Sequence, residues 1–220
     1  MSIVDYYNKK KAFKIEDYYN ISIHNERLLK AIEDKLTWFH GGIRHPLKAE
    51  YWEDIWDQCM NPDGSNWIGG GHQSGADTKH INSNVSYQNK SGQIKGNNVE
   101  ITSHRTKDAG PSMEEKLKFI SKDHCDKYVL LSRDEKDWKK KIKSYNLMIF
   151  DSNIIDFKKL DWSPHIPGRG KNKGKHNGGY IGSGEPDKYS ARIDGPGSSN
   201  QLHITINLDY IGGYHKFIIP

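Results

Sequence analysis

The residues of this chain best suited to chemistry are Asp77 and a triplet that follows it after ten intervening residues, Gln88-Asn89-Lys90. A phosphodiester is very stable in water, so its hydrolysis needs a divalent metal that binds the phosphate and activates a water molecule. An aspartate supplies the hard oxygen ligand that Mg²⁺ prefers, and a lysine supplies positive charge beside the water or the phosphate. Residues 88 and 90 of a strand point to one face, so Gln88 and Lys90 can converge on one metal site.

This pattern resembles the PD-(D/E)xK nuclease superfamily and, within it, the type II restriction endonucleases. In this sequence the motif reads Ala76-Asp77, then Gln88-Asn89-Lys90, within residues 75–105. Alanine replaces the motif's proline, and Gln88 replaces its second acid with a neutral amide oxygen. The resemblance implies that Asp77 binds Mg²⁺, that Gln88 helps through its side-chain oxygen, and that Lys90 positions or activates water. The backbone oxygen of Asn89 is a further metal ligand on this view.

The second acid of the motif must then come from elsewhere in the chain. Glu100 lies on the next predicted strand and is one candidate ligand, although its same-face neighbours Asn98 and Thr102 include no lysine. A solvated acid paired with a lysine across the strands is the alternative for Glu100. The helical region offers other acids, and the sequence does not choose among them: Glu26, Glu50 and Glu53.

Basic and polar residues in three places are candidates for DNA contact. Arginine binds phosphate bidentately or reads guanine in the major groove. The three places are the end of the strand after the motif, a glycine-rich basic loop, and a predicted C-terminal strand pair. The residues are Ser103, His104, Arg105, Lys107, Arg169, Lys171, Lys173, Lys175, Arg192, Gln201 and His203. Structural ion pairs and a solvated loop are the alternatives.

Composition sets wide limits on the function. A length of 220 residues suits one domain, and a net charge of +5 with a pI of about 8.9 fits a polyanionic partner without requiring one. Cys59 and Cys125 have no zinc-site spacing, which favours reduced thiols in the cytoplasm of a bacterial-type cell. We expect no membrane segment and no signal peptide, because the chain has neither a run of 18 apolar residues nor an apolar stretch at its start.

The pattern of apolar residues predicts an α/β fold with a central mixed sheet flanked by helices, and the resemblance implies a restriction-endonuclease-like core. Helices are expected over 24–38, 46–60 and 113–121, the last opened by a capping box at Ser112. Strands are expected over 76–81, 84–91, 98–104, 127–132, 145–151, 189–194, 202–209 and 214–219. Within one domain, residues 1–62 would be mainly helical, 75–152 the catalytic sheet core, 163–188 a basic glycine-rich loop, and 189–220 the C-terminal strands.

The function that these observations favour is site-specific, Mg²⁺-dependent hydrolysis of double-stranded DNA by a type II restriction endonuclease. A homodimer is expected, because two sites related by a two-fold axis match a palindromic duplex. Three alternatives remain open. They are a structure-specific or repair nuclease of the same superfamily, a non-catalytic DNA-binding module, and a β-rich domain that binds carbohydrate or protein.

Overall fold

The computed structural model describes residues 21–60, 67–69, 77–80, 84–121, 125–168, 173–185, 187–195 and 200–220. Its helices are α3 (Glu26–Gly42), α4 (Ala49–Met60), α5 (Met113–Ile120), α6 (Glu135–Lys139) and α7 (Leu208–Ile211), with 3₁₀ turns η1 (Ser152–Ile154) and η2 (Phe157–Lys159). Its strands are β1 (Trp67–Gly69), β2 (Thr78–His80), β3 (Ser86–Lys95), β4 (Asn98–Arg105), β5 (Lys127–Asp134), β6 (Lys143–Asp151), β7 (Asp161–Pro164), β8 (Tyr180–Ser183), β9 (Tyr189–Ile193), β10 (Gln201–Asn207) and β11 (His215–Ile219).

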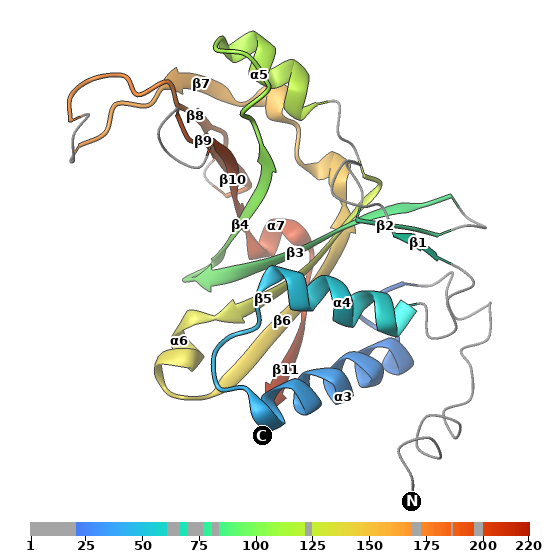
Figure 1. Cartoon of the computed structure of the whole chain (residues 1–220). Helices are drawn as coiled ribbons and strands as arrows, with labels where there is room; N and C mark the ends of the chain where they lie inside the picture. The colour runs from blue at the N-terminus through green and yellow to red at the C-terminus, as the bar shows by residue number, and fades with distance from the viewer. Residues whose placement is uncertain are drawn as a thin grey trace, which may run out of the picture.

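The strands form one large mixed sheet with helices against it, which confirms the predicted fold class at this level (Figure 1). Its strand order is β11-β6-β5-β3-β4-β10-β9-β8-β7, and β2 adds to β3 beside β1. Among the described strands, β3 and β5 are the only parallel pair. Parallel neighbours need a long crossover, and here β4 and α5 lie in the chain between them.

Apolar side chains bury both faces of the middle of this sheet. On one face, α3 and α4 pack over β5, β6 and β11, and Trp52 and Trp56 of α4 are fully buried. The opposite face holds a second core with residues from β4, β10, α5 and α7. Val129 belongs to the first core and Leu130 to the second, so β5 is apolar without alternation, as a strand buried on both faces must be.

Side-chain caps fix the starts of α3 and α5, and a tertiary contact fixes the start of α4. Asn25 accepts from Leu28 N at the start of α3, and the Ser112–Glu115 capping box opens α5 as predicted. Helix α4 begins three residues later than predicted. The reason is that Leu47 N donates to the Tyr145 hydroxyl at 2.8 Å, which holds the preceding chain against β6.

The predicted loop over 163–188 is wrong in part, because β7 and β8 form a hairpin at its two ends. The glycines of this segment suggested an open chain. A Cβ at Gly182 would lie 2.9 Å from atoms of Leu160 and Trp162, so this glycine permits close packing. A second correction concerns the strand expected over 202–209. Strand β10 ends at Asn207, whose side chain accepts from Asp209 N and caps α7.

A buried histidine makes the stability of the α3 core depend on pH. Three hydrogen bonds run in series: Leu47 N–H donates to the Tyr145 oxygen, the Tyr145 hydroxyl to His40 Nε2 at 2.9 Å, and His40 Nδ1–H to the Ile43 carbonyl at 2.8 Å. This arrangement requires neutral His40, because a protonated ring leaves the Tyr145 hydroxyl without an acceptor. Burial accordingly lowers the pKa of His40 below its ordinary value of 6.5.

We expect the free energy of unfolding to fall as the pH drops below about 6.5. The unfolded chain takes up the His40 proton first, so the stability that neutral His40 provides is present above this pH and lost below it. Titration of one group changes the free energy of unfolding by at most about 1.4 kcal/mol per pH unit. His40→Gln should flatten this part of the profile in urea titrations at pH 7.5, 6.5 and 5.5. His45→Gln, an exposed control, should keep the wild-type slope. Equal slopes for wild type and His40→Gln would contradict the assignment.

Candidate active site between β2 and β4

One edge of β3 is shared by two partner strands that leave a gap between them. Tyr87 pairs with Thr78 of β2, whereas pairing with β4 begins only at Gly92, opposite Ile101. The edge of β3 along residues 88–91 therefore borders the fork between β2 and β4. Figure 1 shows β4 rising away from β3 while β2 lies near the other end of β3.

Asp77 precedes β2 and projects its carboxylate into this fork. Its backbone N–H donates to the Tyr87 carbonyl at 2.9 Å. Its Oδ2 accepts from Asn89 N at 2.7 Å and from Lys90 Nζ at 3.1 Å. The two charged side chains are partly buried, with 22% of Asp77 and 15% of Lys90 exposed. The structure thus brings Asp77 and Lys90 together.

Gln88 lies beside this ion pair among neutral buried groups. Its Oε1 accepts a weak S–H hydrogen bond from Cys125 at 4.0 Å. Tyr128 is the register partner of Gln88 on β5, and its hydroxyl has a hydrogen bond with the Ser103 side chain. Burial raises the pKa of Cys125 to about 12 and also raises the pKa of Tyr128, so both groups stay neutral.

The available oxygen donors fit a Mg²⁺ ion that the substrate and water help to hold. Among the described residues, no three His, Cys, Asp or Glu side chains converge on one point. The donors at the fork are Asp77 Oδ1, Gln88 Oε1 and the Asn89 carbonyl, which points to the same edge of β3 as the Asn89 N–H. Mg²⁺ commonly binds through one or two carboxylates, retains several waters and adds substrate phosphates. One carboxylate with neutral oxygens meets that description.

The structure does not bring Glu100 to this site. Glu100 lies opposite Gln93 on the face of the sheet away from Lys90. Its carboxylate accepts from Lys95 Nζ at 2.6 Å and from Gln93 Nε2 at 3.0 Å. The hydrogen bond from Lys95 is the main cause that lowers the pKa of Glu100. Glu50 and Glu53 of α4 lie on that other side of the sheet as well.

The predicted DNA contacts divide between two faces. Ser103 lies at the fork, and exposed Arg105 pairs in register with Gln201, with exposed Lys107 in the turn that follows β4. Two other candidates lie on the opposite face, bound to Asp194: Arg192 Nε at 3.1 Å and His203 Nε2 at 2.9 Å. Lys173 and Lys175 are exposed between β7 and β8. Arg169 and Lys171 lie outside the described residues, as does the side chain of His104.

The sequence interpretation missed Cys125 and Tyr128, which form the wall beside Gln88. They reach this place through the parallel pairing of β3 with β5. A lone cysteine and a tyrosine in an apolar run carry no local signal of such a contact. Their position follows only from the crossover between β3 and β5.

A scan against protein-family models and searches of curated proteins and solved structures return no match. Within the described residues, none of the helices has both the length and the apolar character that crossing a bilayer requires. The geometry of the fork is therefore the basis for a functional proposal.

Proposed function

We propose that the chain hydrolyses phosphodiester bonds in double-stranded DNA with Mg²⁺, as a site-specific nuclease of the type II restriction endonuclease kind. The observation that carries this proposal is the Asp77–Lys90 pair, with 3.1 Å between Oδ2 and Nζ, beside Gln88 at the fork. An acid, an amide oxygen and a lysine on adjoining strands are the parts that metal-assisted phosphodiester cleavage needs.

Each group at the fork has a distinct role in this proposal. Asp77 Oδ1 and the oxygens of Gln88 and Asn89 would hold Mg²⁺, which when bound supplies charge to the phosphate and lowers the pKa of bound water. The Lys90 ammonium lies beside the scissile phosphate and stabilises the negative charge that grows on it. The hydrogen bond from Asn89 N fixes the Asp77 carboxylate. Partial burial keeps bulk water from screening these charges.

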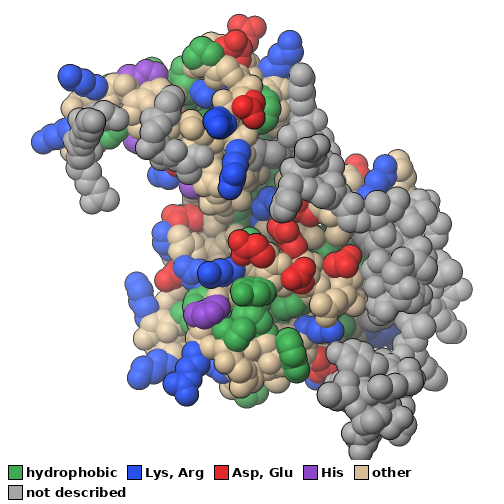
Figure 2. Space-filling view, viewed as in Figure 1, with side chains coloured by type: hydrophobic (Ala, Val, Ile, Leu, Met, Phe, Trp, Pro, Cys, Tyr) green, Lys and Arg blue, Asp and Glu red, His purple; other side chains and the backbone are tan. Residues whose placement is uncertain are grey.

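The charge on the outer surface favours approach of DNA from the Lys90 side of the sheet. Acidic side chains gather over α4, on the other side (Figure 2), and Glu50, Asp54 and Asp57 are exposed there. A polyanion is repelled by this surface. The proposed enzyme is a homodimer, because a two-fold pair of sites would cut both strands of a palindrome.

The test is incubation of the full chain with phage-sized duplex DNA, with Mg²⁺ or with EDTA. We expect discrete bands that require Mg²⁺ and disappear in Asp77→Ala. Asp151→Ala is the matched control, because it removes a surface carboxylate paired with Lys127 at 2.6 Å. The absence of cleavage by a folded wild-type protein would refute the proposal. Nicking without discrete bands would replace it with the structure-specific alternative.

The turn between β7 and β8 should contribute to DNA affinity through charge alone. The double variant Lys173→Ala, Lys175→Ala is expected to reduce the slope of log affinity against log salt by about 0.9 for each phosphate that the variant no longer binds. Lys30→Ala is the control, because Lys30 is paired with Glu33 and Asp34 on α3, in the other part of the molecule (Figure 1). Fluorescence anisotropy in EDTA at several salt concentrations measures the slope. An unchanged slope would show that these lysines do not bind phosphate.

A further inference from the structure

A hollow of about 730 Å³ lies on the face of the sheet opposite Lys90. It is open to solvent and is lined by the start of α4, by Ser91 of β3, by the end of β5 and by α6. Side chains of adjacent strand residues point to opposite faces, so Ser91 faces the hollow while Lys90 faces the fork. A volume of this size suits a small ligand. The proposed nuclease chemistry uses none of the residues that line it.

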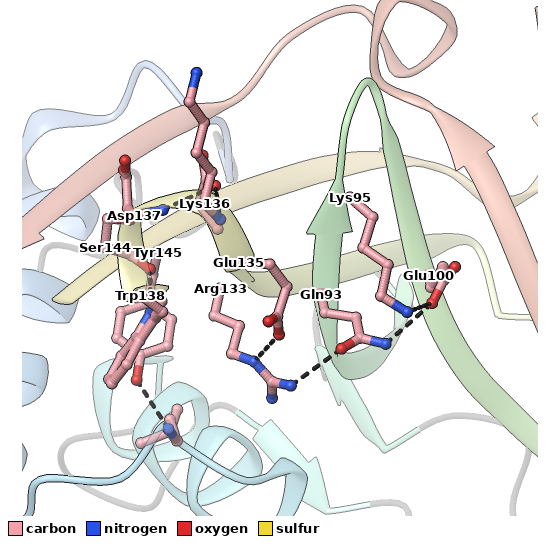
Figure 3. A network of polar contacts seen from close by, with 12 residues as sticks. Gln93, Lys95, Glu100, Arg133, Glu135, Lys136, Asp137, Trp138, Ser144 and Tyr145 are labelled. Carbon is pink, nitrogen blue, oxygen red and sulfur yellow. Dashed lines mark hydrogen bonds and ion pairs between the residues drawn. The ribbon is translucent and has the colours of Figure 1, made fainter. Parts of the chain in front are cut away.

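Arg133 is held in a fixed orientation at this hollow. Its Nε donates to Glu135 Oε1 at 2.6 Å and its Nη2 donates to Gln93 Oε1 at 3.0 Å. Gln93 is itself fixed by its hydrogen bond to Glu100 (Figure 3). Figure 3 shows the third guanidinium nitrogen directed away from both partners, and within the described residues it has no hydrogen bond. An arginine ordered in advance by two acceptors loses little side-chain entropy when it binds an anion.

The charges around Arg133 suit one phosphate group. Lys48 and Lys139 also line the hollow, whereas Glu50 and Glu135 are its two carboxylates. Three cations against two carboxylates leave a small positive excess, which favours a ligand with one phosphate over a more highly charged triphosphate. The exposed acids that follow along α4 repel a long polyanion, so a DNA duplex is a poor occupant.

An aromatic surface lies beside these charges. The Trp138 indole N–H donates to the Ser144 carbonyl at 3.0 Å, and its ring packs edge-on against Tyr145 with 5.7 Å between centroids. These contacts hold the indole ring in place at the hollow. A fixed indole is a good surface for stacking a planar base.

We propose that this hollow binds a mononucleotide, with its single phosphate on Arg133 and Lys48 and its base against Trp138. The site is separate from the fork and does not depend on the nuclease proposal. Its ligand is a free nucleoside monophosphate, recognised by one phosphate and one aromatic ring.

The test uses full-length Asp77→Ala protein in EDTA, so that neither cleavage nor Mg²⁺ contributes. Isothermal titration calorimetry is run with 2′-deoxynucleoside 5′-monophosphates and with the corresponding nucleosides. We expect saturable binding of a monophosphate and at least tenfold weaker binding of its nucleoside. Arg133→Gln should weaken the monophosphate at least tenfold. Lys48→Ala changes an exposed side chain and should weaken it several-fold in a protein of unchanged stability. Lys127→Ala, the control, should bind like the parent.

Three results would overturn the inference. The first is no binding of any monophosphate at millimolar concentration. The second is equal affinity in the parent protein, Arg133→Gln and Lys48→Ala. The third is displacement of the bound nucleotide by duplex DNA, which would make the hollow part of the DNA surface. Because none of these titrations involves cleavage, failure of the nuclease proposal leaves their outcomes unaffected.

Discussion

Lys90→Ala is expected to lower the rate of Mg²⁺-dependent DNA cleavage by at least about 100-fold, the effect of removing one transition-state charge donor. The same change should tighten Mg²⁺ binding. In the absence of metal, the Lys90 ammonium neutralises Asp77 Oδ2 at 3.1 Å. Mg²⁺ must compete with that interaction and tolerate a neighbouring positive charge. Removal of Lys90 leaves Asp77 as an unpaired carboxylate at the fork, so affinity for the metal rises while turnover falls.

The two effects are measured separately, by single-turnover cleavage of a duplex and by calorimetric titration of Mg²⁺ without DNA. Lys95→Ala is the matched control. Lys95 lies on the same strand and is ion-paired with Glu100 at 2.6 Å, but on the opposite face. The Lys95→Ala variant should keep both the cleavage rate and the affinity for Mg²⁺ near their wild-type values. A wild-type cleavage rate in Lys90→Ala would show that Lys90 takes no part in catalysis. Weaker Mg²⁺ binding by this variant would show that Lys90 does not compete with the metal.

Gly92→Ala is expected to destabilise the fold by about 3 kcal/mol, the upper end of the usual cost of overpacking. A Cβ at this position would lie 2.7 Å from the Glu100 carbonyl oxygen, 2.8 Å from Ser132 Oγ and 2.9 Å from Ile101 Cγ2. The first of these atoms is backbone on the neighbouring strand and cannot rotate away. Strand β4 must therefore move away from β3 at the point where their pairing begins.

The loss of stability is measured by urea unfolding of Gly92→Ala, with Gly41→Ala as the comparison. Gly41 lies in α3, and a Cβ there would meet nothing within 4 Å. Alanine at a helical position without a clash should stabilise by up to about 1 kcal/mol. Opposite signs for the two variants are expected. A Gly92→Ala protein as stable as wild type would mean that β3 and β4 can separate at little cost.

Local patterns in the sequence predicted helices α3, α4 and α5 and the strand pair of the motif. Leu28, Ile32 and Leu36 recur on one face of a helix, and all three are buried in α3. The turn at Gly96-Asn97 joins β3 to β4 as expected. Strand β3 nevertheless continues to Lys95, past its predicted end at residue 91. Glycine within a strand suggests a break, whereas Gly92 is needed because a neighbouring strand approaches closely.

The sequence could not predict those parts of the site that depend on pairing between distant segments of the chain. The spacing of Asp77 and Lys90 was sufficient to predict their proximity, because β2 and β3 are neighbours in the chain. The side of the sheet on which Glu100 lies depends on its register with Gln93. The positions of Arg192 and His203 depend on the pairing of β10 with β4 and of β9 with β10. The first of these pairings connects segments about a hundred residues apart in the chain. No local pattern carries that information.

The packing of α3 against β11 has a consequence for the order of folding. Helix α3 packs against β11, although these elements are separated by most of the chain. Closing so long a loop is entropically costly before the contacts it permits are formed. The core under α3, which holds Phe217 and Ile219, should therefore consolidate late. The β3–β4 hairpin closes over two residues, so one strand of the fork can find its partner early.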